Sequence, residues 1–500
     1  MTASEQLAQF AAGSKALPKL CREYKKERAT VHLKELVGGA LSFYAAAAVA
    51  KTGGVHIFVA EDRDAAAYLL NDFYNLLDEK QVYFFPSSYK RSAAYGAEDA
   101  QGVVQRTAAM NAVRGFTKGY LVVCTYPEAL AERVVDAATL QRDTIAVKLG
   151  DKISIAVLED ALADANFTRV DFVYEPGQYS VRGGIVDVFS YSESKPYRID
   201  FFGDEVDSIR RFNISSQLSA DKLDRVEIIP NLNAGEAPRV SFVQFAGSSA
   251  ACWFYDADYV LRRVNDLRRK VLADMENPGQ IDRLLTSRNV LLRDMAGNSV
   301  VALRDNLPER PATAAVVFDT APQPKFNKNF EMLADDMIRN SLRGYATYIL
   351  SENKVQVERL ENIFHQIGRG QAAVRSLSVT LHEGFVDNDL KLCLYTDHQI
   401  FDRYQRYRIN GEIRRDEQMT VAELNQLRPG DYVVHIDHGV GRFDGLVKIN
   451  ENGKVHEAIK LVYKDGDVLF VNVHSLHRIS RYKSGDGEPP KVYKLGNGAW

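Results

Sequence analysis

Apolar strand segments alternate with helical segments from Thr30 onward, and this alternation restricts the fold more than any other feature of the sequence. The segments read TVHLKEL, GGALSFYAAAAVAK, VHIFVA, DAAAYLLNDFYNLL, QVYFFP and, further on, GYLVVCTY. Strands that are apolar on both faces need helices on both sides, as in a parallel sheet. The first part of the chain is therefore predicted to be an open α/β domain.

The turn at Gly38-Gly39 stands where a phosphate-binding loop would join the first strand to the first helix. Such a loop reads GxxxxGK[ST], because its lysine and hydroxyl contact the phosphates and Mg²⁺. No Lys-Ser/Thr pair follows these glycines, and the motif occurs nowhere in the chain. We therefore expect no nucleotide hydrolysis, no cofactor and no catalytic residue, and glycines that permit a tight turn.

Composition sets the broad class. The 500 residues are 46% hydrophobic and 26% charged, which suits three to five globular domains. A net charge of −3 argues against a chain whose main task is to grip nucleic acid, although it leaves room for a local basic patch. The cysteines are far apart and without a CxxC motif, which predicts neither disulfides nor a thiolate zinc site: Cys21, Cys124, Cys252 and Cys393.

The N-terminus and the hydropathy pattern bear on location. The first ten residues lack a basic and then apolar signal pattern, and no apolar run approaches the roughly 18 residues of a membrane span. We therefore expect a cytoplasmic protein in a reducing compartment, without membrane contact.

Residues 174–213 are predicted to form an antiparallel meander, because turn pairs such as Pro176-Gly177 and Gly183-Gly184 divide them into short strands. In the strand YRIDFF, alternation places Arg198, Asp200 and Phe202 on one face. Arginine and phenylalanine on one face are typical of a binding hot spot. The alternative is a half-buried strand in which Arg198 pairs with Asp200 or Glu205.

Residues 427–482 are predicted to form a small SH3/Tudor-like β-barrel. Its runs YVVHI, EAIKLVY and DVLFVNV are separated by turn pairs such as Pro429-Gly430, Asn452-Gly453 and Asp465-Gly466. The strand from Val455 to Tyr463 is apolar on both faces apart from Lys460. At the rim of a barrel, such a strand offers unpaired backbone groups to another sheet.

Two clusters of polar residues raise the question of a metal site. The first is acidic and reads Asp200, Asp204, Glu205 and Asp207; the second consists of His435, His438, His456, His474 and His477 with Asp437. Neither has a ligand spacing typical of calcium or zinc. We therefore expect a solvated turn and ordinary histidines, and no metal.

The meander carries a family resemblance. The segments PGQYSVRGGIVDVFS and PYRIDFFGDEVDSIRRF resemble a signature shared by the excision-repair protein UvrB and the transcription-repair coupling factors, within a module of about residues 30–330. The resemblance implies a β-rich domain that docks UvrA, with Arg182, Arg198 and Phe202 as contact residues. The chain departs from UvrB at Gly38, which puts ATP binding and a UvrB-type clamp on damaged DNA in doubt.

The C-terminal strands carry a second resemblance. HGVGRFDG with VNVHSLHRISRY is similar to the RNA-polymerase-interacting module of CarD-like regulators and coupling factors. It implies that this module pairs strands with the β subunit of RNA polymerase, and that Ile459, Lys460 and Leu461 lie in the contact.

The two resemblances imply the N-terminal, non-motor half of a coupling factor, an adaptor that binds stalled RNA polymerase and recruits UvrA for nucleotide excision repair at DNA lesions. ATP, Mg²⁺ and DNA translocation belong to a motor expected beyond Trp500, since KLGNGAW precedes that motor in the family. The rivals are a UvrB-like damaged-DNA-binding protein of the helicase family and a CarD-like transcription regulator.

The expected organisation begins with a UvrB-like α/β domain without a phosphate-binding loop and ends with a linker toward the motor. Its boundaries are 1–130 for that domain, 131–216 for the inserted UvrA-binding domain, 217–330 for the rest of the UvrB-like module, 331–410 for a small α/β domain of unknown role, 411–427 for a linker, 428–483 for the barrel and 484–500 for the last linker.

Overall fold

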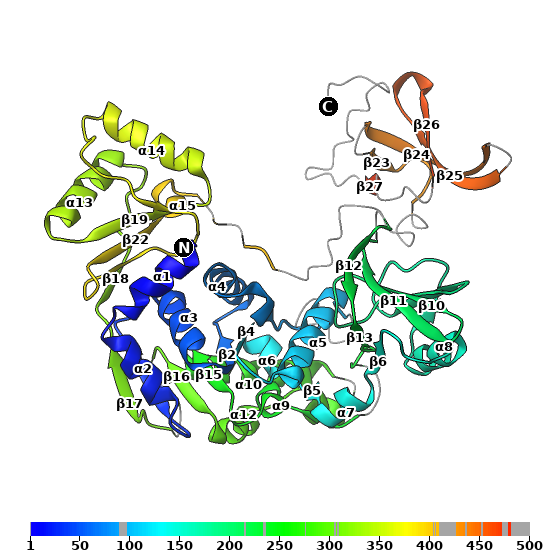
Figure 1. The fold of residues 1–500 in the computed structure, drawn as a ribbon, viewed down its shortest axis with the longest axis horizontal. Helices are drawn as coiled ribbons and strands as arrows, with labels where there is room; N and C mark the ends of the chain where they lie inside the picture. Colours follow the sequence, from blue (N-terminus) through cyan, green and yellow to red (C-terminus); the bar gives the residue numbers. More distant parts are fainter. Residues whose placement is uncertain are drawn as a thin grey trace. The chain divides into compact units, whose positions relative to one another are not determined.

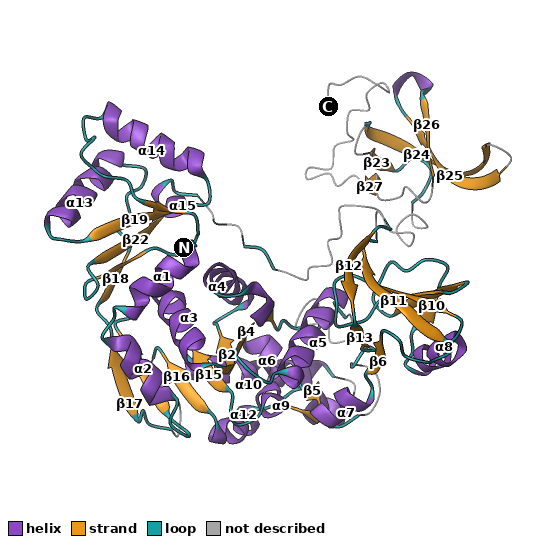
Figure 2. Cartoon of the chain, in the orientation of Figure 1, coloured by secondary structure: helices purple, strands orange, loops and turns teal. Residues whose placement is uncertain are grey.

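The computed structural model of the chain describes residues 2–89, 98–214, 217–233, 237–275, 277–304, 307, 310–403, 405, 407–409, 427–435, 438–451, 454–472 and 479–481. These residues fall into two compact units that divide near residue 412, and each unit is described by itself (Figure 1). The first unit is mixed α/β, and the second consists of β-strands with a short 3₁₀ turn at Lys464–Gly466 (Figure 2). The predicted α/β multidomain class is confirmed at this level.

The centre of the first unit is a seven-stranded parallel sheet. Its strands, in spatial order, are β17 (Ala314–Val317), β1 (Thr30–Lys34), β16 (Ser299–Ala302), β15 (Ala251–Phe254), β2 (Gly54–Val59), β4 (Tyr120–Thr125) and β3 (Val82–Phe84). Consecutive residues of β2, β4 and β15 are buried, so both faces of the sheet are covered. The open parallel sheet predicted from the apolar runs is therefore confirmed.

Helices and short strands complete this domain. They are α1 (Ala3–Ala12), α2 (Ala16–Tyr24), α3 (Ala40–Thr52), α4 (Arg63–Leu76), α5 (Ala100–Gly115), α6 (Pro127–Ala131), α7 (Ala137–Arg142), α9 (Phe242–Ala246), α10 (Ala257–Asp274), α11 (Ile281–Leu284) and α12 (Arg288–Asp294), with β5 (Val134–Val135) paired to β14 (Arg239–Val240). Trp253 donates a hydrogen bond from Nε1 to Nδ1 of His56 at 3.1 Å inside this core.

A β-rich domain is inserted between β4 and β15. Its main sheet has the order β12 (Ser219–Leu223), β11 (Glu205–Phe212), β10 (Tyr197–Phe202), β9 (Ile185–Val188), β8 (Gln178–Arg182) and β7 (Thr168–Arg169), beside the pair β13 (Arg225–Ile228) and β6 (Ile145–Lys148) and helix α8 (Ile155–Asp164). A separate hydrophobic core joins residues from Val147 to Ile228. The antiparallel meander predicted from the turn pairs is therefore present.

A small α/β domain follows β17 almost without a break. It contains β18 (Thr320–Pro322), α13 (Phe330–Leu342), β19 (Ala346–Leu350), α14 (Lys354–Gln366), β20 (Ser376–Leu377), β21 (Phe385–Asp387), β22 (Leu392–Thr396) and α15 (Asp397–Ile400). Leu381, Phe385 and Leu394 belong to the core of the parallel-sheet domain. The hydroxyl of Tyr44 donates to Asp387 at 2.5 Å. The small domain therefore packs firmly on the first domain.

The turn at Gly38-Gly39 lies in the contact between the two domains. Gly38 has a positive φ of 58°, which favours glycine. A Cβ on Gly39 would lie 2.1 Å from the carbonyl oxygen of Glu383. The tight turn predicted from these glycines is therefore confirmed, and the main chain of Glu383 and Gly384 covers the start of α3.

The end of the first unit runs along α4. Tyr407 donates a hydrogen bond to Asp64 at 2.9 Å, and Tyr68 of α4 donates to the carbonyl oxygen of Gln405 at 3.3 Å. Arg408 forms an ion pair with Glu79 at 3.2 Å. We call the described residues 405 and 407–409 the strap.

The second unit contains β23 (Tyr432–His435), β24 (Gly439–Glu451), β25 (Lys454–Val462), β26 (Val468–Asn472) and β27 (Ile479–Arg481). They pair antiparallel in the order β26-β25-β24-β23-β27. Asp437, His474, His477 and the two predicted linkers, apart from Leu427, lie outside the described residues. Within the described part of the chain, no three His, Cys, Asp or Glu side chains form a metal-binding group, and no helix has the length and apolarity of a membrane span.

Candidate protein-interaction surfaces

The two faces of β10 differ as the alternation predicts. Tyr197 and Ile199 are buried in the core of the β-rich domain. Arg198 and Phe202 lie on the opposite face, and Phe202 is 84% exposed at the end of the strand, before the turn residue Gly203. An aromatic side chain with so little cover is available to a partner.

Asp187 of β9 organises the arginines of this face. It is buried directly opposite Arg198 and accepts hydrogen bonds from Nε and Nη2 of Arg198 at 2.7 and 2.9 Å. Arg182 donates to the same carboxylate at 2.6 Å. The alternative in which Arg198 pairs locally with Asp200 or Glu205 is therefore wrong, because Arg198 binds Asp187, and Asp200 is bound by Arg210 and Ser208 instead.

Aromatic rings hold both guanidinium groups in place. Arg198 lies over Phe212 at 4.4 Å and Arg182 over Phe172 at 4.6 Å. The hydrogen bonds to Asp187 raise the pKa of Arg198 above its usual range, so the arginine stays charged. These contacts fix two planar cations on one sheet face.

Exposure separates the three predicted contact residues. The side chain of Arg198 is 15% exposed, whereas that of Arg182 is 37% exposed. Arg182 and Phe202 therefore present most of the accessible surface, and Arg198 mainly supports it. Sequence reasoning missed Asp187, although an acid in the otherwise apolar strand IVDV is the kind of residue that needs a buried partner.

The C-terminal strands contradict one premise of the sequence analysis. β25 lies between β24 and β26 rather than at an edge, since Ile459 is paired with Leu446 on one side and Val471 on the other. Ile459 and Leu461 are buried in the core of this unit. The expectation that β25 offers an unpaired edge is wrong, because a strand that is apolar on both faces is placed in the interior.

Among the described strands, β26 and β27 lie at the two ends of this sheet, and β26 is paired with β25. Phe470 is 49% exposed on it and Val468 is exposed. Lys460 of β25 lies opposite Phe470 and forms an ion pair with Asp444 at 2.8 Å. Of the three residues predicted for this contact, only Lys460 therefore reaches the surface. An unpaired strand edge beside an exposed aromatic side chain suits strand addition by a partner.

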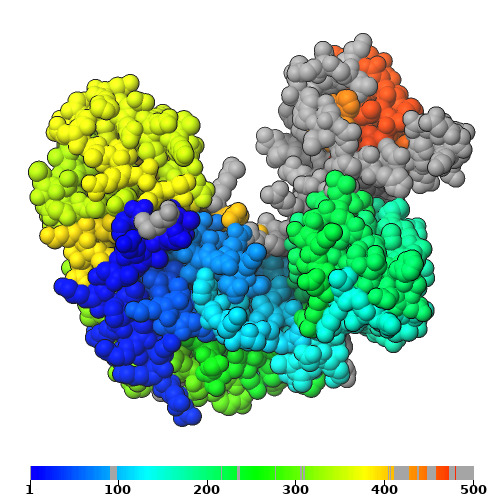
Figure 3. All heavy atoms as spheres, viewed as in Figure 1, coloured from blue at the N-terminus to red at the C-terminus, as the bar shows by residue number. Residues whose placement is uncertain are grey.

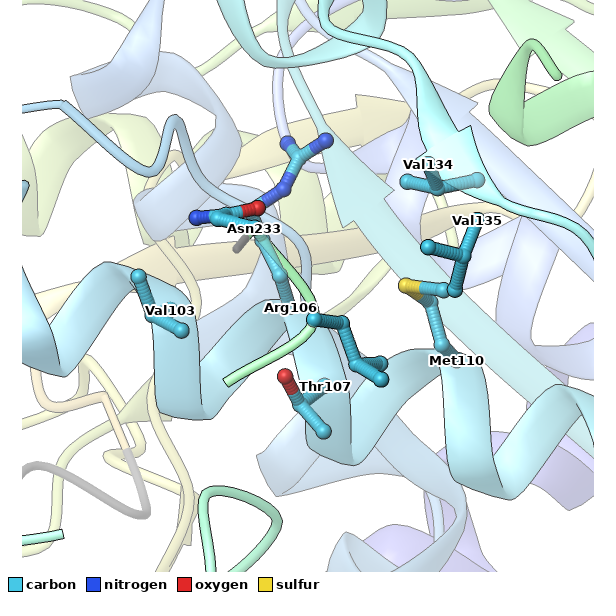
Figure 4. Close-up of a pocket in the computed structure, with 8 residues that line it drawn as sticks. Val103, Arg106, Thr107, Met110, Val134, Val135 and Asn233 are labelled. Atoms are coloured by element: carbon cyan, nitrogen blue, oxygen red, sulfur yellow. The ribbon is translucent and has the colours of Figure 1, made fainter. Parts of the chain in front are cut away.

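Two cavities that described residues line offer no clearer ligand site. A cavity of about 10 Å³, the size of one water molecule, lies between α5 and β5, beside Arg106, Met110 and Val135 (Figure 4). A cleft of about 220 Å³ borders β3. Its carboxylates are already paired, Glu193 with Arg211 at 3.1 Å and Glu79 with Arg408 of the strap.

Two family models match the chain on these two surfaces. Residues 145–233 match the UvrB interaction domain, and residues 427–483 match the CarD-like/TRCF RID domain. The first match covers the strands that carry Asp187 and Phe202, and the second covers β23 to β27.

Curated relatives match nearly the whole chain. The chain is 24% identical to the transcription-repair-coupling factor of Bacillus subtilis and 24% identical to that of Escherichia coli, in each case over 94% of this chain and 46% of the relative. For the same protein of Staphylococcus haemolyticus the identity is 24%, over 86% of this chain and 43% of the relative. The chain thus spans less than half the length of these relatives. The two domain matches, together with an alignment over nearly the whole chain, show that the chain is similar to transcription-repair-coupling factors.

Proposed function

We propose that this chain is an adaptor that joins RNA polymerase stalled at a DNA lesion to UvrA, and so recruits nucleotide excision repair. The observation that carries the proposal is the presence of a UvrB interaction domain and a CarD-like/TRCF RID domain in one chain. Each domain has its own hydrophobic core. An adaptor requires two binding domains that fold independently, one for each partner.

The UvrA contact is assigned to the face that Phe202 and Arg182 present. Truncation of an exposed aromatic or arginine hot spot typically costs about 2 kcal/mol or more, which is roughly thirtyfold in affinity. Phe202→Ala and Arg182→Ala are therefore expected to weaken UvrA binding at least tenfold in calorimetry. Val157→Ala is the matched control, since Val157 is exposed on α8 of the same domain. An equal loss of UvrA affinity in the Val157→Ala control would place the contact elsewhere. Unchanged UvrA affinity in a variant that combines Phe202→Ala and Arg182→Ala would do the same.

The polymerase contact is assigned to the free edge of β26, with the β subunit as the partner that adds a strand. We take the five strands as the SH3/Tudor-like barrel of this function. Phe470→Arg carries an unpaired charge into an apolar contact, so the variant is expected to lose polymerase in a pull-down while its circular dichroism stays unchanged. Leu446→Arg is the control, because Leu446 is exposed on β24. If only the control variant lost binding, the edge assignment would be wrong.

ATP chemistry is assigned to the part of the relatives that this chain does not match. The turn at Gly38-Gly39 lacks the lysine and hydroxyl of a phosphate-binding loop, and Glu383 contributes its carbonyl oxygen at that place. Purified residues 1–500 are therefore expected to show no DNA-stimulated ATP hydrolysis. ATP hydrolysis by this chain that is abolished when Gly39 is substituted would contradict this assignment.

A further inference from the structure

Helix α2 has an apolar face and an opposite basic face. Leu17, Leu20 and Tyr24 are buried. The opposite side carries the basic stripe, which we define as Lys15, Lys19, Arg22 and Lys26. Lys15, Lys19 and Arg22 follow the spacing i, i+4 and i+7, which keeps them on one side of α2, and Lys26 lies just beyond the end of the helix. All four residues are exposed, and the N-terminal residues form part of the molecular surface (Figure 3).

Positive charge is dense here although the whole chain is slightly acidic. Residues 14–28 contain six Lys or Arg and two Glu, against a net charge of −3 for the chain. Glu23 is bound by Arg22 at 3.2 Å and by Lys26. Lys15 is 90% exposed, with Asp389 at 3.9 Å, and Lys19 forms no ion pair with a described residue. Much of the local charge is therefore left for a partner.

Helix stability does not account for the stripe. Cations near the C-terminus of a helix interact favourably with its dipole, which explains Arg22 and Lys26. Lys15 is the N-cap of α2 and Lys19 lies in its first half, where a cation opposes the dipole. The first turn of α2 contains no acidic residue to compensate. The charges at this end therefore lower the stability of the helix and need another explanation.

We propose that the basic stripe binds the phosphate backbone of double-stranded DNA without reading its sequence. Lys15, Lys19 and Arg22 span about 10 Å along the helix, with Lys26 beyond its end, and such a row of cations suits a regular array of phosphates. A protein partner is disfavoured, because α2 exposes no large apolar side chain that would form the centre of an interface. Single-stranded nucleic acid is disfavoured because no aromatic side chain is exposed on α2 for base stacking. This surface is separate from both surfaces of the proposed adaptor function.

The test is fluorescence anisotropy of the full chain with a labelled 30-base-pair duplex over a series of salt concentrations. The variant Lys15→Gln, Lys19→Gln, Arg22→Gln removes three charges of the stripe. Its affinity at low salt is expected to fall at least tenfold, and the slope of log K against log salt to shrink by about 2 to 3. The matched control is Lys354→Gln, Arg359→Gln, Arg375→Gln, which changes exposed residues of the small α/β domain and gives the same net charge.

Four outcomes decide between these possibilities. A loss of DNA affinity in the stripe variant but not in the control variant, with an unchanged circular dichroism spectrum, supports the proposal. An equal loss of DNA affinity in both triple variants overturns the proposal, and so does the absence of DNA binding by the unmodified chain. Binding of the unmodified chain to phosphatidylserine vesicles with the same selectivity, in the absence of DNA binding, would assign the stripe to a lipid surface instead and also overturn it.

Discussion

Asp187 of β9 and Arg198 of β10 are joined by two hydrogen bonds, of 2.7 and 2.9 Å, inside the sheet that carries the proposed UvrA contact. The carboxylate is buried, and the same guanidinium lies over the ring of Phe212 at 4.4 Å. A buried carboxylate that loses its partner keeps its full desolvation penalty. Arg198 therefore contributes to the folding of the β-rich domain, whereas Phe202 is exposed and free to bind.

Arg198→Ala is expected to lower the unfolding free energy of the β-rich domain by about 2 kcal/mol, because Asp187 loses its two-point partner and keeps only Arg182. Phe202→Ala is expected to stay within about 0.5 kcal/mol of the parent chain. Urea unfolding, with proteolysis of the domain as the readout, measures the unfolding free energy of both variants. Equal stability of the two variants would show that the ion pair does not hold the face.

Gly39→Ala is expected to destabilise the contact between the parallel-sheet domain and the small α/β domain. The new methyl group would lie 2.1 Å from the carbonyl oxygen of Glu383, so the main chain has to move. We expect a loss of about 2 kcal/mol and faster hydrogen exchange at Glu383 and Gly384. Gly115→Ala at the end of α5 is the control, because its methyl group would meet no neighbouring atom within 4 Å. An unchanged exchange rate would contradict the tight approach.

Asp72 makes stability depend on pH near neutrality. Burial raises the pKa of its carboxyl to about 7, although Ser42 and the amide of His382 donate to it at 2.7 Å. The folded state therefore binds this proton more tightly than the unfolded state, and the resulting stability is lost as pH rises from about 4 through 7. Asp72→Asn is expected to reduce the fall in melting temperature between pH 5 and pH 8. An identical fall in both proteins would contradict this assignment.

His56 acts in the opposite direction at lower pH. Burial lowers the pKa of its imidazole to about 4, and its neutral ring accepts from Trp253 and lies 3.1 Å from the carbonyl oxygen of Gly53. The unfolded state binds a proton that the folded state excludes, so stability is lost as pH falls from about 6.5 to 4, by about 3 kcal/mol. In denaturant titrations, His56→Gln is expected to flatten this part of the profile. A profile as steep as that of the parent chain would assign the effect to other groups.

The sequence predicts most of the fold because single-strand patterns report local burial. The runs VHIFVA and GYLVVCTY become β2 and β4 of the parallel sheet, and the alternation in YRIDFF places Ile199 inside and Phe202 outside. Those outcomes depend on each strand alone. The position of a strand within its sheet depends on its neighbours.

Most differences between prediction and structure involve contacts between residues that are distant in the sequence. Arg198 pairs with Asp187 across the sheet, eleven residues away, rather than with a residue of its own hairpin. The sequence predicts that the strand of Ile459 lies at the rim of the barrel, whereas this strand is paired on both sides, which is typical of a strand that is apolar on both faces. The contact of Gly39 with Glu383 joins two domains and leaves no local pattern in the sequence.

The strap determines which part of the first unit bears a force applied to the chain beyond Ile409. Tyr407 and Arg408 are attached to Asp64 at the start of α4 and to Glu79 just beyond its end. A pull on the chain beyond Ile409 is therefore borne by α4 and the parallel sheet, and it bypasses the small α/β domain even though that domain is nearer in sequence. A partner that pulls on the second unit would therefore load α4 first, through the hydrogen bond of Tyr407 and the ion pair of Arg408.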